Sequence, residues 1–124
     1  MAGLTLDAGA LIAYERGSER IRAILAVAYG RGLVPTVPAI ALAEVWRGDA
    51  KDARVARLLK ACSIEIVDEK LARTAGSLRR NTPGSATIDA CIAAGVRRRH
   101  DAIATSDPDD MRTLLGSEFT ILTV

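Results

Sequence analysis

The feature that most constrains this chain is the alternation of short apolar runs with helical segments along its whole length. Short apolar runs bounded by turn or cap residues predict strands, and apolar residues at helical spacing predict helices. The predicted strands cover residues 3–7, 33–37, 63–67, 102–105 and 120–124. The predicted helices cover residues 8–16, 18–30, 39–48, 52–61, 68–78, 85–99 and 108–115.

Strands that alternate with helices are joined by right-handed crossovers, which give a mainly parallel sheet with helices on both faces. We therefore predict an α/β fold, a three-layer α/β/α sandwich with about five strands. The 124 residues contain no internal repeat or linker, so we expect a single domain over 1–124. No apolar run approaches the length of a membrane span, and the amino terminus has no signal-peptide pattern, so we expect no membrane association and a soluble, cytoplasmic protein.

Four acidic residues are hard to place on structural grounds alone. Asp7 and Asp107 follow predicted strands and precede helices, where aspartate is also a common helix cap. Glu44 lies in an apolar helical run, so a buried carboxylate with a partner is expected there; the alternatives are a rim position or a salt bridge. Asp89 shares a helical side with apolar residues, although it also suits the helix start through the dipole.

The carboxyl ends of parallel strands meet at one edge of the sheet, where ligands bind in open α/β folds. Four carboxylates gathered there would repel one another unless a cation lay between them, and Mg²⁺ or Mn²⁺ prefers such oxygen ligands. A divalent ion of this kind activates water for phosphodiester hydrolysis. The pattern therefore predicts catalytic, metal-binding roles for Asp7, Glu44, Asp89 and Asp107.

Other chemistries have little support in the sequence. His100 is the only histidine and ends a helix behind three arginines, and there is no GxSxG elbow, so a nucleophilic triad is not indicated. Neither a GxxxxGK[ST] nor a GxGxxG pattern is present. Cys62 and Cys91 lie in apolar patterns and are expected to be reduced, inert core residues.

Basic residues outnumber acidic ones, 17 to 15, and are spread along the chain. They either form a surface that holds a phosphate backbone or reflect the coding bias of a GC-rich genome. Aromatic residues make up only 3%, so RNA would be held mainly through its backbone and shape rather than by stacking. The candidate RNA contacts, which could equally form a solvated face, are Arg79, Arg80, Arg97, Arg98 and Arg99.

Four segments give the chain a resemblance to a known family. They are LDAGALIAY at 6–14, VPAIALAEVWRG at 37–48, TPGSATIDACIAA at 82–94 and ATSDPDDMRTL at 104–114. In this order and spacing they resemble the PIN-domain ribonucleases, and in particular the VapC-type toxins of type II (VapBC) toxin–antitoxin systems.

The resemblance implies a Mg²⁺- or Mn²⁺-dependent endoribonuclease that cleaves structured cellular RNA, tRNA or rRNA, and so inhibits translation. It implies that Asp7 and Asp89 are the most direct metal ligands, with Glu44 and Asp107 completing the pocket. Asp110 matches an additional acid of some members, and Thr105 and Ser106 are candidates for orienting water. It also implies a homodimer and a cognate VapB-like antitoxin that inserts a peptide into the acidic pocket.

One position departs from the pattern. Many members carry a hydroxyl residue two positions after the first aspartate, where this chain has Gly9. The hydrogen bond by which that hydroxyl would orient the site is therefore either absent here or supplied by Thr105 or Ser106. The sequence has two alternative interpretations: a catalytically weak PIN-like RNA- or partner-binding module, and a phosphoacceptor receiver domain with Asp68 as acceptor, which would require a lysine late in the chain that is not present.

Overall fold

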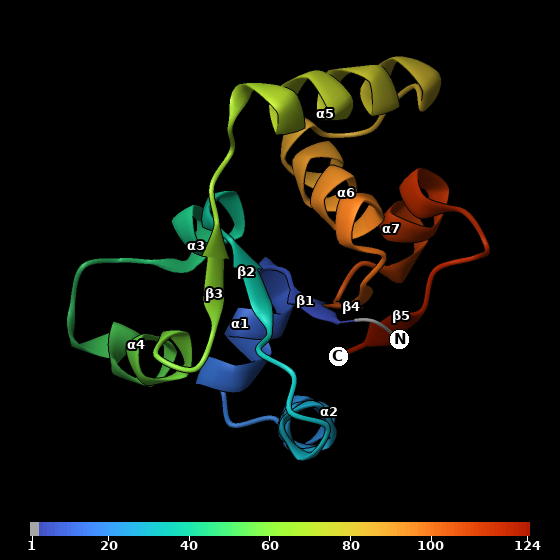
Figure 1. Cartoon of the computed structure of the whole chain (residues 1–124). Coiled ribbons are helices and arrows are strands. Elements are labelled where there is room, and N and C mark those ends of the chain that lie inside the picture. The colour runs from blue at the N-terminus through green and yellow to red at the C-terminus, as the bar shows by residue number, and fades with distance from the viewer. Residues whose placement is uncertain (1–2) are drawn as a thin grey trace.

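A computed structural model describes residues 3–124 and contains one five-stranded sheet (Figure 1). All of its strand pairs are parallel, and the strand order is β3-β2-β1-β4-β5. The strands are β1 (Leu4–Leu6), β2 (Thr36–Pro38), β3 (Ser63–Glu65), β4 (Ala102–Thr105) and β5 (Ile121–Thr123). The first strand of the chain is thus the middle strand of the sheet.

Helices connect the strands, as the periodicity predicts. They are α1 (Ala8–Glu15), α2 (Glu19–Gly30), α3 (Ala39–Val45), the short 3₁₀ turn η1 (Ala50–Asp52), α4 (Ala53–Leu59), α5 (Glu69–Asn81), α6 (Thr87–Arg99) and α7 (Pro108–Leu115). Among residues 3–124, none of these helices combines the length and the apolar character needed to cross a lipid bilayer.

Two apolar cores lie on the two faces of the sheet. Leu4, Leu6 and Ala104 point to one face, where they pack with residues of α1, α2 and α4. Ile103 points to the opposite face and packs with residues of α5, α6 and α7. Figure 1 shows these two helix groups on either side of the strands. The predicted three-layer α/β/α sandwich is therefore confirmed.

Some predicted element ends and caps are wrong, for local reasons. The strand predicted over 33–37 begins only at Thr36, because the backbone N–H of Leu33 donates to the carbonyl of Ala28 and closes the end of α2. Ser18 precedes α2 as expected, but its side chain makes no capping hydrogen bond. Asp68, in contrast, accepts a hydrogen bond from the backbone N–H of Leu71 and caps α5.

A buried polar network fixes the carboxyl-terminal end of α6 over the sheet. The guanidinium of Arg99 contacts Glu65 of β3, Asp101 just before β4 and the hydroxyl of Thr5 in β1. The Thr5 hydroxyl donates to Asp101 at 2.8 Å. Because this network ties α6 to three strands, it also sets the position of the opposite, amino-terminal end of α6, which carries one of the candidate acids.

The two cysteines and the histidine occupy positions that suit structural rather than catalytic roles. Cys91 is buried and Cys62 is partly buried, and both are free thiols. Burial raises the pKa of the Cys62 thiol to about 11, so little reactive thiolate forms at neutral pH. His100 ends α6 in a left-handed conformation with φ 56°, and its ring centroid lies 4.8 Å from that of Phe119.

Candidate active site at the carboxyl edge of the sheet

Asp7 lies where the central strand β1 meets helix α1, and it is buried with 7% exposure. Its Oδ1 accepts a hydrogen bond from the backbone N–H of Ala10 at 3.0 Å, so the predicted capping role is present. Burial raises the pKa of Asp7, the charge of Asp107 adds to this, and hydrogen bonds from the Thr105 hydroxyl and the Ala10 amide oppose it. Capping therefore satisfies only part of this carboxylate.

Asp107 lies on the neighbouring strand connection, between β4 and α7. Its side chain makes no capping hydrogen bond to α7, which removes the structural explanation that the sequence left open. Its backbone N–H donates instead to the buried hydroxyl of Thr105 at 3.0 Å. That hydroxyl oxygen accepts from Asp107, and Thr105 also lowers the pKa of Asp7, so Thr105 lies between the two acidic segments.

Glu44 and Asp89 approach the same edge from two helices. Glu44 is on α3 and is exposed to solvent, which agrees with the rim position left open by the sequence and not with a buried side chain, whereas Asp89 in the first turn of α6 is partly buried. Partial burial is the main cause that raises the pKa of each carboxyl. Asp89 and Asp107 raise the pKa of Glu44 further, and Asp110 and Asp107 do so for Asp89.

These mutual effects show that the fold brings the four predicted acids, and Asp110, into one neighbourhood. The charge of Asp107 acts on three of the other carboxyls, so this residue lies among them. None of the ion pairs within residues 3–124 involves any of the five acids, which are Asp7, Glu44, Asp89, Asp107 and Asp110. The site therefore carries several negative charges that no basic side chain of the described chain balances.

The donor set agrees with a hard divalent cation, because every candidate ligand atom is a carboxylate oxygen. As the side chains are placed, however, no three acidic, histidine or cysteine groups within residues 3–124 are close enough to hold one ion together. The carboxylates are thus near enough to repel one another but do not converge on a single point.

Because Gly9 has no side chain, the start of α1 and the β4–α7 connection can approach each other closely. A Cβ atom at position 9 would lie 2.1 Å from the Ser106 Oγ and 2.9 Å from the Ser106 backbone nitrogen. The serine hydroxyl therefore occupies the space that a side chain at position 9 would fill, next to Asp7. Of the two residues expected to replace the missing hydroxyl, Ser106 is the one placed at that point, while the Thr105 hydroxyl accepts from the Asp107 backbone N–H and lowers the pKa of Asp7.

The sequence profile of the PIN domain family matches residues 4–114, which include all of these acids. The chain belongs to the PIN domain family. Members of this family are generally nucleases and typically use divalent metal ions. No curated protein shows a significant sequence match to this PIN domain.

Solved structures of other proteins have the same fold. A chain of the DNA-bound VapBC2 complex from Rickettsia felis matches with a TM-score of 0.80 and 12% identity, over 98% of each chain. A chain of the DNA-bound VapBC complex from Salmonella typhimurium gives 0.77 and 18%, over 99% of this chain and 98% of its own. A chain of a toxin–antitoxin complex from Klebsiella pneumoniae gives 0.75 and 18%, over 96% and 100%. At these identities the match concerns the fold.

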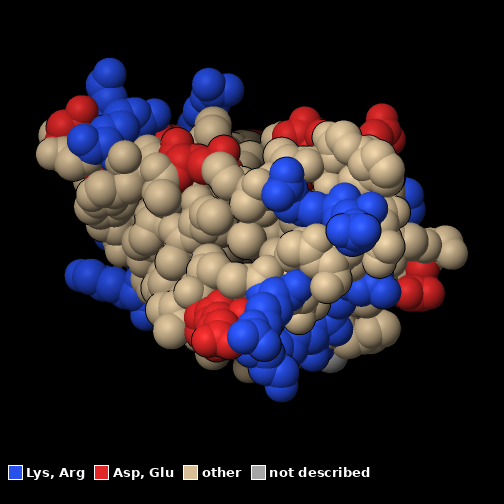
Figure 2. Space-filling view, turned by 90° about the horizontal axis from the view of Figure 1, so that it is seen from above, with Lys and Arg blue, Asp and Glu red and all other residues tan. Residues whose placement is uncertain are grey.

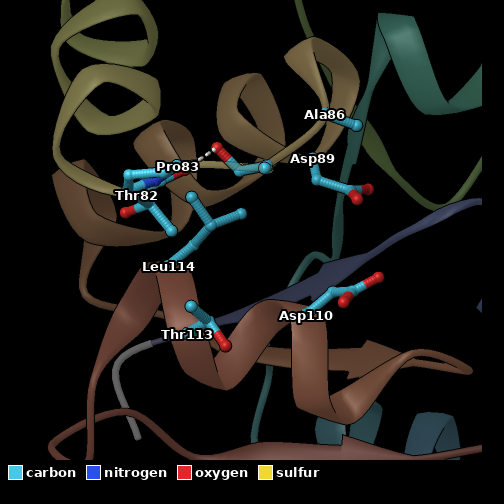
Figure 3. A pocket seen from close by; sticks show the side chains of 9 residues that line it. Thr82, Pro83, Ala86, Asp89, Asp110, Thr113 and Leu114 are labelled. Carbon is cyan, nitrogen blue, oxygen red and sulfur yellow. Dashed lines mark hydrogen bonds between the residues drawn. The ribbon is translucent and has the colours of Figure 1, made fainter.

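A pocket that the sequence pattern does not predict lies beside the acids of this PIN domain. The loop between α5 and α6 faces helix α7 across a cavity of about 200 Å³ (Figure 3). Asp89 and Asp110 line it, and it is completed by Thr82, Pro83, Gly84, Ser85, Ala86, Thr113 and Leu114. The only sequence signal was the turn-forming Pro83–Gly84 pair ahead of a helix that carries a candidate acid.

The five arginines proposed to contact RNA fall into two groups. Arg79 and Arg80 are exposed in the last turn of α5, next to the pocket loop. The three arginines in the last turn of α6 instead contact other parts of the same chain. Arg97 donates to the carbonyls of Leu114 and Leu115, and Arg98 and Arg99 pair with Glu65. Figure 2 shows basic groups interspersed with acidic ones, not one continuous basic surface.

Proposed function

We propose that this PIN domain is the toxin of a type II toxin–antitoxin pair and a Mg²⁺- or Mn²⁺-dependent endoribonuclease. The observation that carries the proposal is the group of five carboxylates that lacks a basic partner at the carboxyl edge of the sheet. Such a group is destabilising by itself, because like charges are held close together. A site of this kind is explained by a cation that binds there during function.

Asp7, Asp89, Glu44 and Asp107 are the residues that would hold the ion. When bound, it would supply the acidity that activates a water molecule and the positive charge that stabilises the leaving oxygen. Asp7 accepts a hydrogen bond from the Ala10 amide, so one ligand is positioned before binding. Glu44, exposed on α3, can move toward the others at little cost.

The remaining groups would position the RNA. Arg79 and Arg80 are exposed and would contact phosphates at the loop end of the pocket, opposite the acids, and Ser106 can donate a hydrogen bond near Asp7. Since the attacking group would be water, the products would carry a 5′-phosphate and the adjacent 2′-hydroxyl would not be needed. Structured RNA, tRNA or rRNA, is the substrate class that we propose.

A VapB-like antitoxin is the proposed protein partner. The structures that share this fold include VapBC and other toxin–antitoxin complexes. The chain also leaves several large apolar side chains exposed, among them Ile66 at 67% and Val34 at 63%, as proteins with a binding partner commonly do. A homodimer is proposed for the toxin, and its molar mass in solution by light scattering tests this.

The deciding experiment compares RNA cleavage by the wild-type chain with that by Asp7→Asn and Asp89→Asn variants, with Mn²⁺ and with EDTA. We expect new 5′-phosphate ends at discrete positions that depend on the metal, and a loss of at least roughly 100-fold in rate in both variants. Cleavage without metal, or an undiminished rate in either variant, would contradict the proposed mechanism.

The second candidate is a catalytically weak RNA- or partner-binding module, and one observation favours it. The acids do not converge on a single point in residues 3–124. Such a module would bind structured RNA or the antitoxin without producing new ends at any Mn²⁺ concentration. The same assay, combined with a gel-shift measurement, separates the two functions.

A further inference from the structure

The pocket between the α5–α6 loop and α7 has two chemically different ends (Figure 3). Asp89 and Asp110 extend to the same side from α6 and α7, while Thr82 and Pro83 form the opposite side. The Ser85 hydroxyl donates to the Thr82 carbonyl at 2.8 Å, which stabilises the loop. One end of the pocket therefore belongs to the candidate active site, and the other extends away from it.

The size and lining of the pocket restrict what it can hold. At about 200 Å³ it is smaller than the pockets of drug-sized ligands. Pro83 and Leu114 give it apolar walls, and the Thr113 hydroxyl donates to the Asp109 carbonyl within α7, which leaves its oxygen as an acceptor. An ionised Asp110 offers only acceptors. A flat ring that carries hydrogen-bond donors on one edge matches these features.

We infer that this pocket binds one unstacked guanine base of the RNA, next to the phosphodiester that is cut, with Asp110 contacting its donor edge. The inference rests on the proposed function and deepens it. Unstacked bases of RNA loops are commonly read on their Watson–Crick edge by side chains. Both Asp89 and Asp110 line the pocket. We assign the base contact to Asp110 because Asp89 is a proposed metal ligand.

Guanine is the base that fits a carboxylate. Its N1–H and its exocyclic N2 amine lie side by side, so they can donate to the two carboxylate oxygens together. Adenine and cytosine each place a ring nitrogen acceptor beside the amine, which a carboxylate repels. Uracil has a single N–H between two carbonyl oxygens. The chemistry of Asp110 therefore favours guanine over the other three bases.

An arginine side chain from a protein partner has similar donors and is the competing occupant. Two observations favour RNA. Arg79 and Arg80 lie in the turn of α5 that leads into Thr82, so they repel a guanidinium but attract the phosphates that flank a base. Pro83 and Leu114 also supply apolar surface for the faces of a ring.

The first experiment measures binding without cleavage. Metal-free protein is titrated with guanosine 5′-monophosphate and with uridine 5′-monophosphate, and the backbone amide signals of Thr82, Gly84, Ser85 and Thr113 are followed by NMR. The two nucleotides share ribose and phosphate, so a difference reports the base. We expect these amides to shift with the guanine nucleotide at concentrations at least several-fold lower. Equal responses, or a response only to an N-acetyl-arginine amide probe, would overturn the inference.

The second experiment measures cleavage of short RNAs that carry each base in turn beside the cut, with Mn²⁺. We expect a roughly 10-fold preference for guanine at one position, in line with a bidentate base contact. Asp110→Asn should remove this preference, even where the loss of its charge beside Asp89 also changes the Mn²⁺ concentration for half-maximal rate. Asp109→Asn is the matched control, since Asp109 lies in the same turn but does not line the pocket.

The outcomes separate this inference from the proposed function. If Asp110→Asn slows cleavage equally on all sequences and more Mn²⁺ restores the rate, then Asp110 acts on the metal and the inference fails. If the wild type cuts RNA without base preference, the inference fails and the nuclease function stands. If no RNA is cut but the guanine nucleotide binds selectively, the pocket assignment stands and the nuclease function fails.

Discussion

At the scale of single residues, the acids differ in how much structure they also support. Asp7 caps α1 and lies among the other carboxylates, so both explanations given by the sequence hold for it. Asp107 caps nothing, although its position before Pro108 suggested a cap. Glu44 was the hardest acid to explain from the sequence, and it is exposed, because α3 presents it at the rim of the edge and not in the core.

Asp89→Asn should make the protein more stable near neutral pH. The pKa of Asp89 is raised by burial and by Asp110 and Asp107, so the folded state favours its protonated form. The stability that protonation adds is present at low pH and is lost as the pH rises above about 4 through the raised pKa. Removing the charge should gain about 0.2–1 kcal/mol at pH 7, as for partly exposed charge pairs.

Urea denaturation at pH 3 and pH 7, in low salt and without divalent ions, measures this effect. The gain of the asparagine variant should nearly disappear at pH 3 and should shrink in high salt, where the repulsion is screened. A variant that is less stable than the wild type at pH 7 would show that Asp89 has a favourable partner.

Gly9→Ala tests the close approach of Ser106. The added methyl group would lie 2.1 Å from the Ser106 Oγ, so the β4–α7 connection must shift. Overpacking of this kind costs about 1–3 kcal/mol, which chemical denaturation can measure. Adding Ser106→Gly should restore part of the loss, and not all of it, because the Ser106 backbone nitrogen lies 2.9 Å from the new atom. Equal stability of wild type and Gly9→Ala would contradict the placement of Ser106.

At the scale of elements, the alternation of apolar runs predicted every strand and α-helix in order but not the 3₁₀ turn η1, because most of these elements bury a face whose period is visible locally. The ends were less predictable, since they depend on contacts made elsewhere. Leu33 gives its N–H to the end of α2, which the pattern over 33–37 does not reveal. The arginine run of α6 looked like a surface patch because its partner, Glu65, lies on a distant strand.

Gly95→Ala should destabilise the protein although alanine favours helix. Gly95 is within α6, and a Cβ there would lie 2.1 Å from the Glu65 Oε1 and 3.0 Å from its Cδ. The clash should cost about 1–3 kcal/mol by displacing the network around Arg99. Gly76→Ala in α5 is the matched control: nothing lies within 4 Å of its Cβ, so it should gain up to about 1 kcal/mol. Thermal unfolding of both variants gives the comparison, and a stabilised Gly95→Ala would refute the packing argument.

At the scale of the whole molecule, the sheet order explains why the acid group could be predicted and the pocket could not. Strand β1 pairs with both β2 and β4, so residues that follow these strands meet at one edge whatever the details of the loops. The pocket instead needs the α5–α6 loop to face α7. That arrangement depends on how α6 packs against both neighbours, which a single sequence does not encode in a readable pattern.

Divalent ions should stabilise the whole fold if the acid group binds them. Binding to the native state alone adds about 2.7 kcal/mol at a hundred-fold excess over Kd. We therefore expect Mn²⁺ to raise the melting temperature of the wild type by several degrees and that of Asp7→Asn much less, in calorimetry that requires no RNA. An equal rise in both proteins would indicate non-specific binding.

The position of β1 in the middle of the sheet also determines when the chain can complete its fold during synthesis. Leu4 pairs with Ala102 and Leu6 with Ala104, so the central strand leaves the ribosome long before its β4 neighbour exists. At translation rates of about 5–20 residues per second, the two halves of the acid group are separated by roughly 5–20 s. If the chain is the proposed nuclease, its acid group cannot form before β4 and Asp107 have been made, and a partner that is already present could bind the site as it assembles.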